Sequence, residues 1–169
     1  MFEIANNYNS NKKFFYETLF SQLKAMMEEE KNVIALTANI SSLLWHSLPR
    51  INWVGFYFYD EKDDELVLGP FQGKPACTRI KPGKGVCGVA FEKGKTQRID
   101  DVYAFSGHIV CDPESRAELV IPLFKKNKGW GVLDIDSPEN NRFDQKDQEG
   151  LERFARYLEA YLFNQASNG

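Results

Sequence analysis

The sequence has no apolar run of the ~18–20 residues that a membrane-spanning helix needs. Its polar start, MFEIANNYNSNKKFF, has neither the apolar segment nor the small-residue cleavage site of a secretory signal peptide. It also lacks an excess of basic residues, since the formal net charge is −3, so no basic face favours binding to nucleic acid or to an anionic membrane. We therefore expect a cytoplasmic protein that binds neither.

Internal repeats, low-complexity segments and Pro/Gly/Ser-rich linkers are absent as well. The 169 residues fit one domain of the usual ~100–200 residues. Hydrophobic residues make up 43% and aromatic residues 14% of the chain, a balance that disfavours disorder and supplies a sizeable core. We expect a single domain over residues 1–169, with its core over about 30–165 and an N-terminal helical region over 1–30.

Apolar spacing predicts helices over residues 10–30 and 33–45 and a last helix that begins near the N-cap Asp144. Short strands are predicted over 52–59, 65–69, 76–80, 97–99, 118–124 and 130–136, with a short helix over 86–92. The connection 100–116 is long and shows little periodicity, which is typical of functional loops. This order predicts an α+β fold whose mostly antiparallel sheet has the terminal helices on one face and a pocket under loops on the other.

No C-x-x-C pair is present, which excludes a thioredoxin-type redox motif. The cysteines are Cys77, Cys87 and Cys111, and thiols of a reducing compartment are buried structural groups, metal ligands or catalysts. Cys111 lies in a polar loop, where His108 and a short helix expected to begin at Asp112-Pro113 would stabilise a thiolate. A zinc site built from the cysteines and His108, or a set of structural thiols, remains open at this point.

Three carboxylates are expected to converge near the Cys111 loop. Asp134 and Asp136 share one face of a strand because side chains alternate with period two. The antiparallel hairpin brings Glu118, at the start of the preceding strand, close to both. Crowded carboxyl groups raise one pKa and so supply a proton donor, and they also suit an ammonium ligand. An ordinary solvated strand end and a metal site stay open as alternatives.

Trp53 and Tyr57 lie four residues apart in a predicted strand and therefore share a face. Such a pair is commonly part of a core. On a sheet face that the terminal helices leave uncovered, it would form a box for a small apolar or onium-like group.

Five segments in fixed order resemble the free methionine-(R)-sulfoxide reductases, a family of single-domain GAF proteins: NWVGFY, GPFQGKPACTRI, GKGVCGVAFEKGKTQRIDDV, FSGHIVCDPESRAELVIPL and GVLDIDSP. The resemblance covers about residues 40 to 160. It implies a six-stranded antiparallel GAF sheet with helices on one side and a pocket on the other. It also implies an oxidoreductase that reduces free L-methionine-(R)-sulfoxide, with thioredoxin as the reductant.

The resemblance implies a role for each thiol. Cys111 would be the nucleophile and would become a sulfenic acid. Cys77 would resolve it by forming a disulfide, with Cys87 as the alternative resolving cysteine. No metal and no other cofactor is implied, and a homodimer is left open by analogy with other GAF proteins.

The same resemblance assigns the other candidate residues. Glu118 and Asp136 would hold or protonate the sulfoxide oxygen. Trp53 and Tyr57 would enclose the substrate methyl group, and Asp134 would help to hold the ammonium together with the other two acids. Two rival functions remain: a GAF sensory module that binds a small molecule, and a thiol redox switch without turnover.

Overall fold

The computed structural model of the chain describes residues 8, 10–28, 30–107, 109 and 111–163. Its helices are α1 (Lys12–Met27), α2 (Val33–Ser47), α3 (Gly85–Lys93) and α4 (Gln145–Phe163), with a short 3-10 helix, η1 (Val102–Ala104). Its strands are β1 (Trp53–Asp60), β2 (Glu65–Gly73), β3 (Arg79–Ile80), β4 (Gln97–Ile99), β5 (Ala117–Lys125) and β6 (Lys128–Ser137). No helix in this part of the chain is long and apolar enough to cross a membrane.

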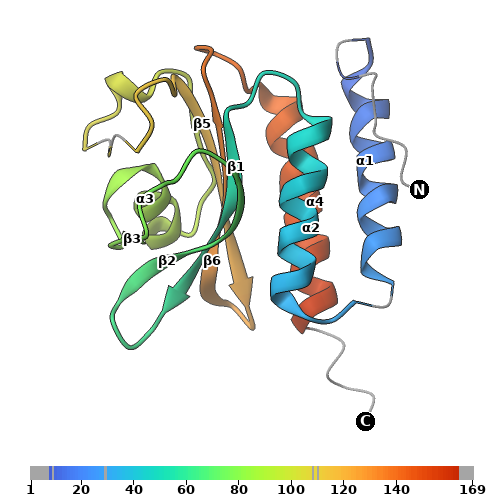
Figure 1. Ribbon diagram of the computed structural model, residues 1–169, viewed down its shortest axis with the longest axis horizontal. Helices are drawn as coiled ribbons and strands as arrows, with labels where there is room; N and C mark the ends of the chain where they lie inside the picture. Colours follow the sequence, from blue (N-terminus) through green and yellow to red (C-terminus); the bar gives the residue numbers. More distant parts are fainter. Residues whose placement is uncertain (1–7, 9, 29, 108, 110, 164–169) are drawn as a thin grey trace.

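The six strands form one antiparallel sheet in the order β3-β2-β1-β6-β5-β4. In Figure 1, α2 and α4 lie against one face of this sheet, and α1 packs outside them as a further layer. Helix α3 and the long loops lie on the opposite face. The predicted α+β GAF-like architecture is therefore confirmed, and the side of the sheet away from the terminal helices is the one available to a ligand.

Strand β1 separates two hydrophobic clusters because its side chains alternate between the faces of the sheet. Val54 and Phe56 belong to the larger cluster, which the terminal helices cover. Trp53 and Tyr57 point the other way and pack with Cys87 and other residues of α3. The aromatic pair thus does belong to a core, but to the smaller one beside the loops.

Helix α4 starts with a reciprocal cap, as expected from Asp144. The backbone N–H groups of Lys146 and Asp147 donate to Asp144 Oδ1 at 2.9 and 3.0 Å. In return, Asp147 Oδ2 accepts from the backbone N–H of Asp144 at 2.9 Å. This arrangement satisfies amide groups that the first turn of a helix leaves without intrahelical partners.

Asp147 also holds α1 against α4. The hydroxyls of Tyr8 and Tyr16 both donate to Asp147 Oδ1 at 2.7 Å. Arg142 and Lys12 form ion pairs with Asp147 Oδ2 at 3.4 and 2.8 Å. Asp147 and Arg142 are fully buried as side chains, so each charge depends on the other for compensation.

Two local expectations were wrong. The strand predicted over 76–80 is reduced to β3, so Cys77 lies in a loop. The Cys77 carbonyl accepts a hydrogen bond from the Tyr57 hydroxyl, and the Lys74 carbonyl accepts one from the Trp53 indole N–H. Neither carbonyl accepts from a neighbouring strand in these bonds.

The helix expected to begin at Asp112-Pro113 is a turn. The backbone N–H of Glu114 donates to Asp112 Oδ1 at 2.9 Å, and that of Ser115 donates to the Asp112 carbonyl at 3.2 Å. The chain then becomes extended, because the Arg116 N–H donates to the Ser137 carbonyl at 2.7 Å. A helix dipole therefore does not act on Cys111. The predicted contribution of His108 concerns a residue outside the described ones.

Asp147→Ala should lower the free energy of unfolding by about 3–5 kcal/mol, because it leaves Arg142 buried without its counter-charge. Urea unfolding followed by circular dichroism measures the change. Glu139→Ala is the control, since it removes an ion pair to Arg50 in which both side chains are about half exposed and should cost less than ~1 kcal/mol. Equal losses in the two variants would contradict the role given to Asp147.

Candidate active site

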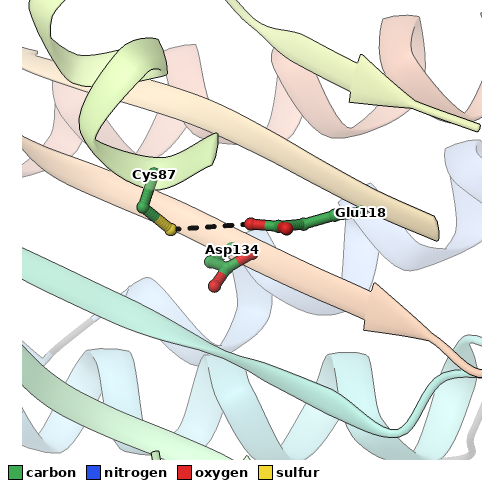
Figure 2. Close-up of side chains that lie close together, drawn as sticks. All are labelled: Cys87, Glu118 and Asp134. Carbon is green, nitrogen blue, oxygen red and sulfur yellow. Dashed lines mark hydrogen bonds between the residues drawn. The ribbon is translucent and has the colours of Figure 1, made fainter. Parts of the chain in front are cut away.

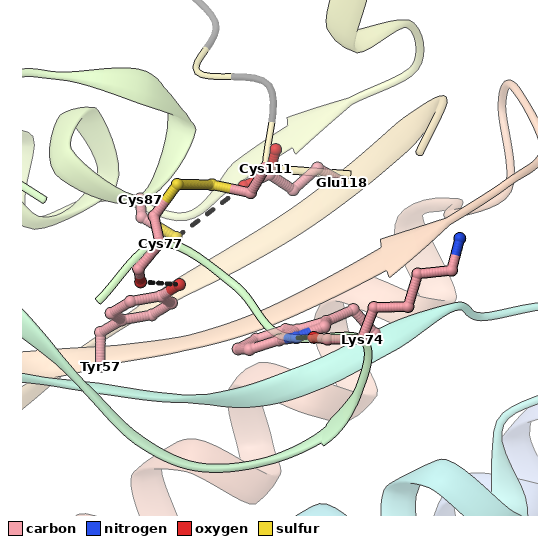
Figure 3. Close-up of a disulfide and its surroundings, with 7 residues drawn as sticks. Tyr57, Lys74, Cys77, Cys87, Cys111 and Glu118 are labelled. Carbon is pink, nitrogen blue, oxygen red and sulfur yellow. Dashed lines mark hydrogen bonds between the residues drawn. A yellow bond between two sulfur atoms is a disulfide. The ribbon is translucent and has the colours of Figure 1, made fainter. Parts of the chain in front are cut away.

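Two of the three cysteines are joined. Cys77, in the loop between β2 and β3, forms a disulfide with Cys111, in the loop between η1 and β5, and their Cα atoms lie 5.8 Å apart. Figure 3 shows this bond with Cys87 nearby. Cys87 is free and buried in α3. The exposure of Cys111 and the burial of Cys87 separate a reactive thiol position from an enclosed one.

The three predicted carboxyl groups meet on the face of the sheet that carries α3. The register pairs Glu118 with Asp136, while Asp134 lies opposite Val120, two residues further along β5. Glu118 and Asp134 are 7% and 6% exposed. Figure 2 shows both converging with Cys87, whose thiol donates to Glu118 Oε1 at 3.9 Å. Asp134 Oδ1 has no hydrogen-bond partner among the described residues.

Burial raises the pKa of all three carboxyl groups. For Glu118 the burial is followed in importance by the charges of Asp134 and Asp136, which hold its pKa well above the usual range. Burial and the charge of Asp134 likewise raise the pKa of Asp136. Burial raises the pKa of Asp134 to about 6. The groups titrate together, so the cluster as a whole, and no single member of it, holds protons to a higher pH than ordinary carboxyl groups.

Trp53 and Tyr57 stack beside these acids, with ring centroids 5.8 Å apart and planes at 26°. Their polar atoms also donate hydrogen bonds to the loop that precedes β3. The Trp53 indole N–H donates to the Lys74 carbonyl at 3.1 Å, and the Tyr57 hydroxyl donates to the Cys77 carbonyl at 3.0 Å. The aromatic pair therefore supports the loop that carries one of the bonded cysteines (Figure 3).

One pocket collects the predicted residues. Its lining includes Trp53, Tyr57, Cys87, Cys111, Glu118, Asp134 and Asp136. The remaining candidate, Cys77, is attached to it through Cys111. The structure thus brings together an exposed sulfur, buried acids and an aromatic surface, which is a combination suited to thiol chemistry on a small polar molecule.

Comparisons with known proteins identify the family of this chain. Residues 33–162 match the GAF domain family. A Bacillus subtilis protein named YtsP is 54% identical over 91% of this chain and 94% of that protein. A free methionine-R-sulfoxide reductase of Escherichia coli is 49% identical over 90% of this chain and 91% of that enzyme. This chain belongs to the free methionine-R-sulfoxide reductase family.

A solved member of the family has the same fold. The free methionine-R-sulfoxide reductase of Neisseria meningitidis, determined in complex with its substrate, superimposes with a TM-score of 0.87 at 42% identity. The match covers 90% of this chain and 91% of that structure. At this identity and coverage, the GAF sheet and its pocket side correspond between the two proteins.

The sequence analysis missed the groups that fix the loops of this family member. Asn52 donates from Nδ2 to Asp112 Oδ2 at 3.3 Å and to Ser115 Oγ at 3.1 Å. Lys74 pairs with Asp112 at 3.6 Å and also with Glu114. The signal available in the sequence was only that Lys74 and Asp112 stand near two cysteines, which does not reveal that they meet.

A cation is chemically conceivable at the bottom of the pocket. Cys87, Glu118 and Asp134 each offer one ligand atom, and these atoms lie within 4.8 Å of one another. Burial, however, raises the pKa of the Cys87 thiol as well as that of Glu118. Metal ligands must be deprotonated, so a cation bound here would have to displace the protons of Cys87 and Glu118.

Glu118→Gln should stabilise the fold increasingly as pH rises. In the unfolded chain Glu118 ionises near its ordinary pKa of about 4.3, whereas in the folded protein it keeps its proton to higher pH. Between these two values the unfolded state binds fewer protons, so the wild-type free energy of unfolding falls with pH. The variant has no carboxyl group at this position, so its free energy of unfolding should exceed that of wild type by on the order of 1 kcal/mol at pH 7.

Urea unfolding at pH 5, 6, 7 and 8 measures this difference. Glu61→Gln changes an exposed glutamate in a turn and should follow the wild-type pH dependence. A Glu118→Gln protein that is less stable than wild type at every pH would show that Glu118 is ionised and compensated in the pocket.

Proposed function

We propose that this protein reduces free L-methionine-(R)-sulfoxide to L-methionine through a cysteine sulfenic acid and an intramolecular disulfide. The observation that carries the proposal is the Cys77–Cys111 disulfide at a pocket lined by three carboxyl groups whose pKa values burial raises. The 49% identity to the Escherichia coli enzyme supplies the substrate. The fold alone would support only a small-molecule-binding GAF domain.

Cys111 is the nucleophile in this proposal. Its thiolate attacks the sulfoxide sulfur, while a proton from Glu118 or Asp136 goes to the sulfoxide oxygen. The S–O bond and the transient bond between the two sulfurs then break as the oxygen passes to Cys111, which is oxidised by two electrons to a sulfenic acid, and the substrate sulfur leaves as the thioether of methionine. The raised pKa values of Glu118 and Asp136 support this role, because a proton donor must be protonated near neutral pH.

Cys77 resolves the intermediate. Its sulfur displaces the hydroxyl of the Cys111 sulfenic acid, which leaves as water, and a disulfide forms. A dithiol reductant, which we take to be thioredoxin in the cytoplasm, then restores both thiols by exchange. We further propose that the chain is one domain over residues 1–169, and we retain a homodimer as a candidate assembly.

Substrate recognition divides between the two halves of the pocket. Asp134, whose Oδ1 lacks a partner among the described residues, accepts the substrate ammonium, with Glu118 and Asp136 nearby. Trp53 and Tyr57 offer stacked rings to the S-methyl group. A buried carboxylate that pairs with a free ammonium would reject peptide-bound methionine sulfoxide, because the amide nitrogen carries no charge.

The test is turnover with thioredoxin, thioredoxin reductase and NADPH. The substrates are free L-methionine-(R)-sulfoxide, its S isomer and an N-acetylated form in parallel. We expect NADPH consumption with the free R isomer alone. Oxidation by peroxide without turnover of any sulfoxide would instead identify a redox switch. Ligand binding by Cys111→Ser without turnover by wild type would identify a sensory module.

Cys111→Ser should abolish turnover, whereas Cys77→Ser should produce one methionine per protein and then turn over slowly with thioredoxin. The reason is that the first change removes the nucleophile and the second removes only the resolving thiol. Rapid-quench counting of methionine separates the two. Full activity of Cys111→Ser would disprove the assignment of the nucleophile.

Cys87→Ala should still form the Cys77–Cys111 disulfide in a single turnover. Cys87 is buried and its pKa is raised by burial, so it is a poor attacking thiol. Mass spectrometry of the alkylated product after one equivalent of substrate measures the outcome, with Cys77→Ala as the matched variant. A disulfide that forms in Cys77→Ala as fast as in wild type would make Cys87 the resolving cysteine.

A further inference from the structure

An ion-pair cluster joins the two loops that carry the bonded cysteines. Lys74 lies three residues before Cys77, and its ammonium is 3.6 Å from Asp112 Oδ2 and donates to Glu114 Oε2. Asp112 directly follows Cys111 in the chain. The cation of one loop therefore sits between two carboxylates of the other, next to the disulfide.

Hydrogen bonds hold both loops of this cluster to β1 or to the residue directly before it. Trp53 in β1 donates to the Lys74 carbonyl, and Tyr57 in β1 donates to the Cys77 carbonyl. Asn52, directly before β1, donates to Asp112 Oδ2 at 3.3 Å. The Asp112 side chain is only 8% exposed, whereas Lys74 is 58% exposed. Asp112 is thus a fixed carboxylate that Lys74 reaches from outside.

We propose that Lys74, paired with Asp112 and Glu114, is a positioning residue that holds the Cys77 loop against the Cys111 loop and sets the rate of disulfide closure. This inference deepens the proposed function, since it concerns the resolving step. Lys74 takes no part in the attack on the substrate. It raises the local concentration of the Cys77 thiol at an oxidised Cys111.

Because Lys74 and Glu114 are exposed, the effect of their ion pair on disulfide closure should depend on salt. Exposed ion pairs are screened by salt, so closure should slow as ionic strength rises. Exposed pairs are also individually weak, so loss of the Lys74 charge should slow closure by about two- to fivefold and not abolish it. A residue that only supports the fold would produce neither the salt dependence nor a selective effect on closure.

The experiment oxidises the reduced full-length protein with one equivalent of hydrogen peroxide instead of sulfoxide. The Cys111 thiolate attacks the peroxide and gives a sulfenic acid and hydroxide. Cys77 then displaces water to form the disulfide. Trapping the sulfenic acid with a 1,3-dicarbonyl reagent at successive times gives the rates of both steps, at low and high salt. Because no sulfoxide is used, the result is independent of the proposed substrate.

Lys74→Met should slow closure about two- to fivefold, leave sulfenic acid formation unchanged and remove the salt dependence. Lys74→Arg should restore closure, because it keeps the positive charge between Asp112 and Glu114. Arg79→Met is the matched control: Arg79 lies two residues after Cys77 and is half exposed, but it pairs with Asp63 and Glu65, outside the Cys111 loop. Its closure rate should equal that of wild type.

Three results would overturn the proposal. The first is closure in Lys74→Met at the wild-type rate with the wild-type salt dependence. The second is an equal slowing in Arg79→Met. The third is slower sulfenic acid formation with unchanged closure, which would mean that the Lys74 charge acts on the Cys111 thiolate. If the protein passes these tests but does not turn over methionine sulfoxide, the positioning role of Lys74 stands and the proposed substrate is wrong.

Discussion

The pairing of β5 with β6 gathers three carboxyl groups on one face of the sheet, two of them buried, and the rest of the site depends on that placement. Glu118 opposes Asp136 in the register, with Asp134 beside them on the same face. Burial raises their pKa values, because a low-dielectric site disfavours three adjacent negative charges. The sheet thereby favours the protonated forms of acids that would be ionised in water at neutral pH.

Strand β1 connects this chemistry to the cysteines. Its Trp53 and Tyr57 form the apolar side of the pocket, and the same two side chains hydrogen-bond to the loop of Cys77. Asn52 at its start holds the turn that follows Cys111. A single strand therefore links the aromatic side of the pocket to both loops of the disulfide, which in the proposed mechanism keeps the resolving thiol close to the reacting sulfur.

The sequence revealed what depends on periodicity and little of what depends on loop contacts. Alternation in β6 and the hairpin order were enough to bring Glu118, Asp134 and Asp136 together, as the structure confirms. Helical spacing located α1, α2 and α4 for the same reason. The turn at Asp112 and the loop at Cys77 were predicted wrongly, because distant partners such as Ser137 and Tyr57 satisfy their backbone groups. Long-range hydrogen bonds of this kind leave no local pattern.

The three thiols show why burial has to be known before roles are assigned. In the sequence, the resemblance implied Cys77 as the resolving cysteine and left Cys87 as the alternative, without a local signal that separates the two. In the fold, Cys87 is a buried residue of α3 whose thiol donates to Glu118, while Cys77 lies in a loop. A thiol that is kept protonated by its surroundings is a weak nucleophile but a good hydrogen-bond donor. We therefore propose that Cys87 helps to orient Glu118, one of the two acids proposed as proton donors, and that disulfide exchange involves the two loop cysteines.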